Sequence, residues 1–231
     1  MLMKKHTQII VGLAILTSNS LHAQTFFVSS ISAGGGDAAD ARHDRWYATS
    51  FTTASQPARV DSMTAVIRLY DGSTMTGFDE FISIYSNSVS NSPDTTGTAI
   101  GTFQDNPSQV PISSFAFTPD GTINLEADTT YWMVFGLNVD DPADPNLGNY
   151  LFEHNWRQAN ANDEGDAGWS IGDRVWRSTD QGSSWQNAWA GASAFRIDGT
   201  IIPEPSEYAF AIGIGLIAFA TFRRIRISQT S

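Results

Sequence analysis

The central part of the chain, residues 24–202, alternates hydrophobic and polar positions in short runs, without a sustained period of 3.6 residues. A period of two indicates β-strands, because successive side chains of a strand point to opposite faces of the sheet. For example, Ile82 and Ile84 would share one face, and Phe81 and Tyr85 the other. The runs are separated by Gly, Pro, Asn, Asp and Ser, which are the residues of turns.

These patterns predict an all-β fold. The expected strands are residues 25–31, 46–52, 60–70, 81–85, 99–103, 114–118, 123–125, 131–137, 150–154, 174–177 and 194–202. Asp71-Gly72 and Asp120-Gly121 are dipeptides of the kind that forms hairpin turns. Short strands with frequent turns are typical of two packed sheets, so we expect a jelly-roll-like β-sandwich.

The first 23 residues have the three parts of a secretory signal peptide. Lys4 and Lys5 carry positive charge, residues 9–16 form an apolar run, and Leu21-His22-Ala23 provides the cleavage region. The run is shorter than the roughly 20 residues of a permanent membrane helix. We therefore expect a signal helix that engages the export machinery and is removed by signal peptidase after Ala23.

The other end of the chain combines a rigid motif, an apolar segment and positive charge. Pro203-Glu204-Pro205 precedes an apolar stretch over residues 208–222, and Arg223, Arg224 and Arg226 follow it. An α-helix over that stretch would cover only about 22 Å of a hydrocarbon core of about 30 Å. We expect an apolar helix that anchors the chain transiently in the inner membrane, with its arginines on the cytoplasmic side.

The ordered combination of these three parts resembles the PEP-CTERM sorting signal of Gram-negative bacteria, over residues 203–231. The resemblance implies that an exosortase, an intramembrane cysteine transpeptidase-like enzyme, recognises and removes the tail. It also implies delivery to the cell surface or to the extracellular polysaccharide matrix. An ordinary C-terminal membrane anchor would share every physical feature except this processing.

We thus expect a signal peptide (residues 1–23), an extracytoplasmic β domain (24–202) and a sorting tail (203–231). The net charge of the whole chain is −11, and both lysines lie in the first segment, so the middle one is strongly acidic. Such a charge repels nucleic acid, which excludes nucleic-acid binding. The chain has no cysteine, so packing without disulfides has to hold the domain together.

A second, softer resemblance lies in residues 125–135, Leu-Glu-Ala-Asp-Thr-Thr-Tyr-Trp-Met-Val-Phe. This segment is similar to a strand that recurs in choice-of-anchor β domains, which are typically fused to surface-sorting tails. A polar turn would precede a strand buried on both faces. The molecular function of that family is undefined, so the resemblance implies a fold and a location but no activity.

Residues 178–185, Ser-Thr-Asp-Gln-Gly-Ser-Ser-Trp, resemble the Asp-box found on hairpin turns of β-propellers and other β proteins. We expect Asp180 to accept turn amides, Gly182 to adopt a positive φ, and Trp185 to pack beneath the turn. A propeller would repeat the motif, and the chain has a single copy. We interpret Ser178, Asp180, Gly182 and Trp185 as a structural turn.

Two kinds of binding site have candidate residues. Asn162, Glu164 and Asp166 have the oxygen ligands and the close spacing that calcium requires. The alternative is an acidic loop that is solvated and binds no metal. We expect no other cofactor. Trp156, Trp169 and Trp189 lie among polar residues and could stack against sugar rings. Packing in the core or beneath turns is the alternative for these tryptophans.

No catalytic grouping is recognisable in the sequence. His43 and His154 belong to no metalloprotease motif, and there is neither a Gly-x-Ser-x-Gly elbow nor a phosphate-binding loop. We therefore expect a non-enzymatic exported protein with a structural or adhesive role at the cell surface or in the polysaccharide matrix. A carbohydrate-binding module is the alternative, and a hydrolase acting on matrix polymers is the less favoured one.

Overall fold

A computed structural model of the chain describes residues 25–31, 38–41, 44–69, 80–104, 112–137, 150–155, 164–165, 168–203, 212–214, 216–217 and 220. Most of the described residues lie in strands, which confirms the all-β class. The predicted signal helix lies outside the described residues. The described residues of the tail beyond Pro203 are helical, and no helix in the described part of the chain is long and apolar enough to cross a membrane.

The strands agree closely with those predicted. They are β1 (Thr25–Ser29), β2 (Ala38–Ala41), β3 (Trp46–Thr52), β4 (Ala58–Leu69), β5 (Glu80–Ser86), β6 (Gly101–Gln104), β7 (Ile112–Pro119), β8 (Ile123–Leu125), β9 (Thr130–Leu137), β10 (Tyr150–Asn155), β11 (Glu164–Gly165), β12 (Ser170–Ser178), β13 (Gln186–Ala190), β14 (Ala192–Ser193) and β15 (Phe195–Ile201). Every predicted strand is present, and β3 and β8 have the predicted bounds. Only β2, β11, β13 and β14 have no counterpart in the predicted set.

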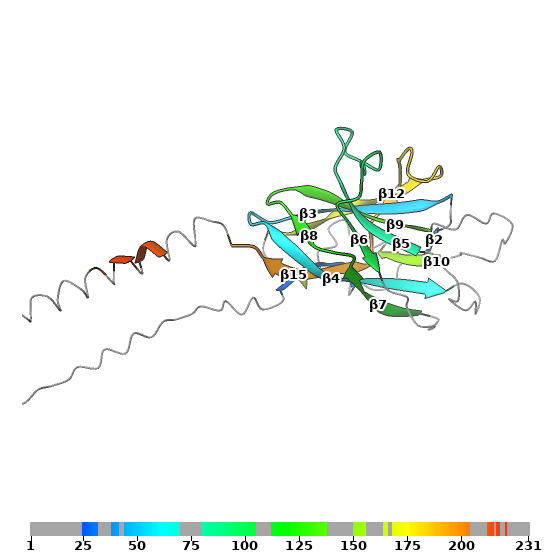
Figure 1. Cartoon of the computed structure of the whole chain (residues 1–231). Helices are drawn as coiled ribbons and strands as arrows, with labels where there is room; N and C mark the ends of the chain where they lie inside the picture. The colour runs from blue at the N-terminus through cyan, green and yellow to red at the C-terminus, as the bar shows by residue number, and fades with distance from the viewer. Residues whose placement is uncertain are drawn as a thin grey trace, which may run out of the picture.

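The strands form one continuous antiparallel sheet in the order β11-β1-β15-β4-β7-β6-β5-β9-β3-β12-β13. β7 joins its two halves, because it pairs with β4 over most of its length and with β6 at its end. We call β11, β1, β15, β4 and β7 the first half, and β6, β5, β9, β3, β12 and β13 the second half. The sheet curls so that the halves form two facing layers (Figure 1). The expected division into two separate sheets is therefore not confirmed.

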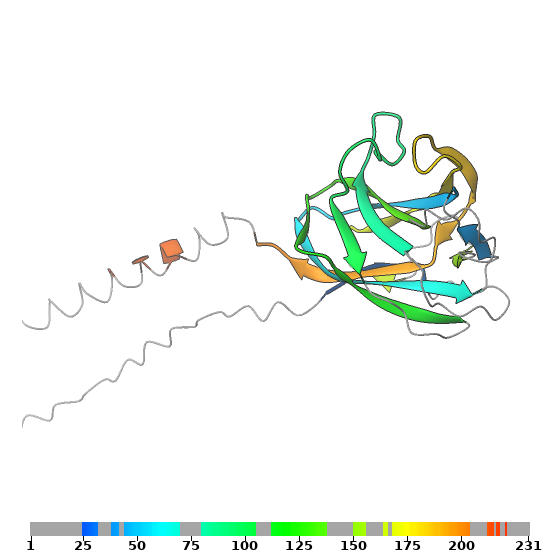
Figure 2. The same ribbon diagram turned by 45° about the vertical axis from the view of Figure 1, so that its right-hand side comes forward.

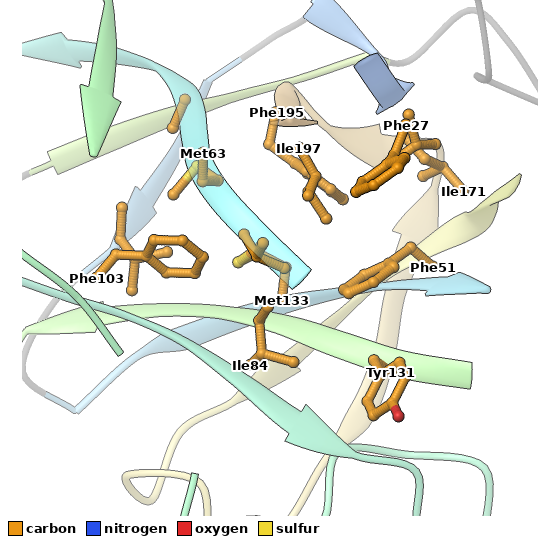
Figure 3. Packing of buried hydrophobic residues seen from close by; sticks show 14 of the residues in the cluster. Phe27, Phe51, Met63, Ile84, Phe103, Tyr131, Met133, Ile171, Phe195 and Ile197 are labelled. Carbon is orange, nitrogen blue, oxygen red and sulfur yellow. The ribbon is translucent and has the colours of Figure 1, made fainter. Parts of the chain in front are cut away.

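The main core lies between the two halves of the curled sheet (Figure 3). Phe195 on β15, in the first half, contacts residues of the second half across this core. Its ring centroid lies 6.3 Å from that of Phe51 on β3 and 6.2 Å from that of Phe135 on β9. All three side chains are fully buried. Burial of one such side chain contributes about 1.5–3 kcal/mol, so the facing layers stabilise the domain without disulfides.

The predicted alternation is found in β5. Ile82 and Ile84 are buried in the main core, whereas Phe81 and Tyr85 lie on the opposite face and are partly exposed. Both faces of this strand therefore carry packed side chains.

A β-bulge at Asp61 adjusts the alternation in β4. The register between β4 and β15 skips Asp61, so that Val60 before it and Met63 after it both face the main core. The Asp61 carboxylate accepts hydrogen bonds from Thr200 Oγ1 at 2.5 Å and from Arg59 Nε at 2.8 Å. Asp61, the extra residue of the bulge, therefore points away from the core, and its carboxylate is hydrogen-bonded.

The turn predicted at Asp120-Gly121 is not a hairpin. β7 and β8 on either side of it do not pair with each other; both pair with the same edge of β4, opposite β15. Gly121, with a φ of 102°, makes the bend that separates these consecutive strands. A bend and a hairpin both need a residue with positive φ, so the dipeptide could not distinguish them. Asp71-Gly72 lies outside the described residues.

Three buried hydroxyl groups connect the two halves beside the main core. The Ser193 backbone N–H donates to Thr49 Oγ1 at 3.0 Å, and Thr49 Oγ1 donates to Ser193 Oγ at 2.9 Å. Ser30 Oγ donates to the Ser193 carbonyl at 2.6 Å and accepts from the Phe195 N–H at 3.1 Å. Thr49 lies on β3 and Ser30 directly follows β1, so this network links strands that share no backbone ladder.

We predict that Thr49→Val lowers the free energy of unfolding by about 1–3 kcal/mol, because an isosteric side chain leaves buried Ser193 groups without partners. Thr52→Val on the same strand is the matched control. Its hydroxyl lies 3.0 Å from that of Thr130 at a partly exposed position, so its loss should be at most about 1 kcal/mol. Urea denaturation measures both, and equal losses would contradict a special role for the buried network.

Candidate functional site

A second hydrophobic cluster lies on the outer face of the second half, on the far side of that layer from the main core. We call it the aromatic face; it consists of Trp46, Ala48, Phe81, Tyr85, Trp132, Val134, Trp176 and Trp185. Ala48, Trp132 and Val134 are buried, and the other five are partly exposed. Four of the seven tryptophans of the chain thus gather on one side of one sheet layer.

Cross-strand pairing brings these side chains together. Ala48 on β3 pairs with Val134 on β9 and with Trp176 on β12. In the neighbouring row, Tyr85 on β5 pairs with Trp132 on β9. Paired residues of an antiparallel sheet point to the same face, so four strands distant in sequence supply one surface.

Gly136 on β9 lets two of the rings close over the strand. A Cβ atom at Gly136 would lie 2.4 Å from Phe81 Cε1 and 2.7 Å from Trp46 Cδ1, which is too close for any side chain. The rings of Phe81 and Trp46 meet edge to face above it, with centroids 4.5 Å apart. The absence of a side chain at Gly136 therefore lets the two rings pack against each other directly over β9.

Two loops stand side by side on this face, one over residues 87–100 and one over residues 178–185 (Figures 1 and 2). Thr95 ties them together: its hydroxyl accepts a hydrogen bond from Trp185 Nε1 at 3.1 Å and donates one to the Gly182 carbonyl. Trp132 Nε1 donates to Asn87 Oδ1 at 2.9 Å. Both loops are thus held to the aromatic face through indole N–H groups.

The loop over residues 178–185 is the turn that resembles an Asp-box. The Asp180 carboxylate accepts hydrogen bonds from Ser184 N at 2.8 Å, Ser184 Oγ at 2.6 Å and Ser178 Oγ at 2.7 Å. Ser178 Oγ accepts from Gly182 N at 2.8 Å, and Gly182 has a φ of 84°. These bonds, first those from the side chains of Ser184 and Ser178, lower the pKa of Asp180. The carboxylate is committed to the turn.

Trp169 and Trp189 do not belong to the aromatic face. Trp169 is 3% exposed and stacks on Phe27 in the main core, with ring centroids 4.4 Å apart, so of the two alternatives for this residue the structure shows packing in the core and not exposed stacking. Trp189 is partly exposed and packs on the inner side of the sheet, 5.4 Å from the ring of Tyr47. Trp156 lies outside the described residues. Because the neighbouring residues in the sequence are polar, the sequence does not show that the rings of Trp169 and Trp189 pack against the main core.

The aromatic face was missed by sequence reasoning because its members are spread over four strands and a loop. Trp46 and Trp176 both lie in predicted strands, but their common face follows from the pairing of β3 with β12. The available signal was the alternation itself: Trp46 and Ala48 occupy the face opposite the buried Tyr47. A tryptophan on the outer side of a strand indicates a second packed surface.

The calcium candidates are only partly described. Glu164 lies in the short strand β11, opposite Ser29, whereas Asn162 and Asp166 lie outside the described residues. Within the described ranges, no group of three or more His, Cys, Asp or Glu side chains could hold a metal ion.

Of the predicted processing residues, only Pro203 is described. It follows Ile202, whose backbone N–H donates to the Pro57 carbonyl at 2.8 Å. Ala23, Glu204, Pro205, Arg223, Arg224 and Arg226 lie outside the described residues. The backbone is therefore hydrogen-bonded to within one residue of the predicted motif.

Chemically, the aromatic face offers ring surfaces and no carboxylate, imidazole or amine among its eight residues. Burial raises the pKa of the Tyr85 phenol, so that hydroxyl stays protonated and can donate or accept a hydrogen bond. The face thus offers ring surface and a neutral hydroxyl for contact with a ligand. No model of a known protein family matches the chain, and no curated protein matches it either.

We predict that Gly182→Ala destabilises the protein more than Gly121→Ala does. Both glycines have positive φ, which costs an alanine about 1–2 kcal/mol. A Cβ at Gly121 would meet no atom within 4 Å, whereas one at Gly182 would lie 2.7 Å from Trp46 Cζ3. Relieving this clash should lower the free energy of unfolding by about a further 1–3 kcal/mol. Urea denaturation of both variants measures the difference; equal losses would show that the turn does not press on the aromatic face.

We also predict that Asp180→Asn lowers the melting temperature at neutral pH and that this deficit shrinks on acidification. The folded-state pKa of Asp180 is lowered, so the carboxylate stabilises the fold above the unfolded value of about 3.9. That contribution is lost as the pH falls through the folded-state pKa. Asp173→Asn, at an exposed position of β12, is the control and should leave the melting temperature unchanged. A deficit that does not shrink at all as the pH falls below the unfolded value of about 3.9 would contradict this linkage.

Proposed function

We propose that this protein is a non-enzymatic, exported β protein with a structural or adhesive role at the cell surface or in the extracellular polysaccharide matrix. Its β domain is jelly-roll-like and of the choice-of-anchor type. Signal peptidase removes the N-terminal segment after export, and an exosortase recognises and removes the tail that begins with Pro203-Glu204-Pro205. Until then the apolar segment of the tail anchors the chain transiently in the inner membrane.

The observation that carries this proposal is where the fold begins and ends. β1 starts at Thr25, two residues after Ala23, and β15 ends at Ile201, two residues before Pro203. Cleavage at both predicted points would therefore remove none of the strands that the structure describes. This agreement supports an independent domain placed between two removable sorting segments.

The two ends of the domain also lie next to each other. Thr25 pairs with Gly199, so the first residue of β1 lies beside the last residues of β15 (Figure 1). Both β1 and β15 contribute to the main core, through Phe27 and through Phe195 and Ile197. A pull on either terminus would thus act on strands fixed at the same end of the sheet, which suits a domain tethered through its termini.

One further observation favours carbohydrate binding as a second function. The aromatic face provides partly exposed rings beside hydroxyl and amide groups, the combination found in small-molecule and sugar sites. It does so at residues other than Trp156, Trp169 and Trp189.

We predict that the mature protein recovered from its own cells extends from Gln24 to near Pro203. Intact-mass spectrometry of material from the cell surface or the culture medium measures this. Replacing Pro203, Glu204 and Pro205 together by alanine should leave the tail attached and the protein in the membrane fraction. Glu207→Ala, close by but outside the motif, is the matched control and should be processed normally.

Mature surface material that still contains Arg226 would contradict processing and favour an ordinary anchor. Full-length chain recovered from the cytosol would contradict export altogether.

A further inference from the structure

We propose that the aromatic face is a binding site for a neutral polysaccharide, whose sugar rings stack against Trp176, Trp185 and Tyr85. This names a ligand class for the proposed adhesive role, and it does not depend on how the protein is sorted. Four properties of this face favour such a ligand: the exposure of its rings, the rigidity of the platform, its polar rim and its charge.

The rings form a platform that is partly open to solvent and firmly supported from below. Trp132 is 2% exposed and lies in the middle, where the ring of Trp176 contacts it edge to face with centroids 5.7 Å apart. Trp176 and its neighbours remain partly exposed around it. Apolar faces of pyranose rings need such exposed aromatic surface to displace water on binding.

Hydrogen bonds fix the platform before any ligand arrives. Trp132 is held by Asn87, and Trp185 by Thr95, which also binds the Gly182 carbonyl. The carboxylate of Asp180 braces the same turn. A preorganised surface loses little conformational entropy on binding, which favours recognition over a purely incidental contact.

The rim of the face carries uncharged polar groups. Asn187 on β13 pairs with Trp176, so its exposed amide lies beside that ring on the same face. Asn87 directly follows β5 and is exposed, and its amide oxygen accepts the hydrogen bond from Trp132 Nε1, so it lies at the edge of the aromatic face. Amide and hydroxyl groups around an aromatic floor match the alternation of apolar ring faces and equatorial hydroxyls in a sugar chain.

Charge restricts the ligand to a neutral polymer. None of the eight residues of the aromatic face is charged, and the chain as a whole carries a net charge of −11. A polyanionic chain would be repelled by the acidic protein as a whole. A neutral polysaccharide pays no such penalty.

The test is affinity electrophoresis of the full-length chain in mild detergent, in gels containing barley β-glucan, xylan, galactomannan or alginate. We expect at least one neutral polysaccharide to retard the protein and alginate to leave it unretarded. Trp176→Ala should weaken the binding at least about tenfold, the loss typical of removing an aromatic anchor. Trp189→Ala, a partly exposed tryptophan on the inner side of the same layer, is the matched control and should bind as the wild type does.

A second variant guards against misfolding of Trp176→Ala. Asn187 is exposed, so Asn187→Ala should keep the wild-type melting temperature while weakening binding about twofold to tenfold through one lost hydrogen bond. No retardation by any of the three neutral polymers would overturn the proposal, as would equal losses in Trp176→Ala and Trp189→Ala. Retardation by alginate alone would overturn the charge argument. None of these results bears on the processing of the tail, which is measured by mass.

Discussion

Burial of one face of a single curled sheet against itself is the interaction on which the rest of this structure depends. The chain has no cysteine, so no disulfide can fix the layers, and the contact of Phe195 with Phe51 and Phe135 has to do so. β7 makes that contact possible because it pairs with both halves and carries the sheet from one layer to the other. The hydroxyl network of Ser30, Thr49 and Ser193 satisfies buried polar groups where the layers approach without a shared ladder.

The second half of the sheet is packed on both of its faces, and this explains the composition of β9. Tyr131, Trp132, Met133, Val134 and Phe135 are all buried, with Met133 and Phe135 in the main core and Trp132 and Val134 in the aromatic face. A strand buried on both sides reads as a continuous apolar run instead of an alternating one. The loop over residues 178–185 contributes to this outer packing, because it carries the indole of Trp185 and is braced by the carboxylate of Asp180.

The sequence predicted the strands well and their pairing poorly, for physical reasons. Alternation is local, so β3, β5 and β8 could be recognised from their own residues, whereas Ala-Ala-Asp-Ala in β2 and the two residues of β14 have no alternation to recognise. Pairing is not local: it decided that Gly121 makes a bend and that Trp46 and Trp176 share a face. For Trp169 the sequence leaves stacking and core packing open, because flanking Gly168 and Ser170 suggest a loop, whereas its ring stacks on Phe27, a residue distant in the sequence.

Because the sheet curls into two layers, the strands that lead to the termini and the aromatic face lie on different layers. β1 and β15, which lead to the two ends of the domain, belong to the first half, and the aromatic face lies on the outer side of the second half. The main core separates them. A domain attached through either terminus would therefore be held by one layer while the other keeps its aromatic side uncovered. This arrangement suits the proposed adhesive role, because a binding surface on the outer side of β15 would lie on the same layer as the attachment.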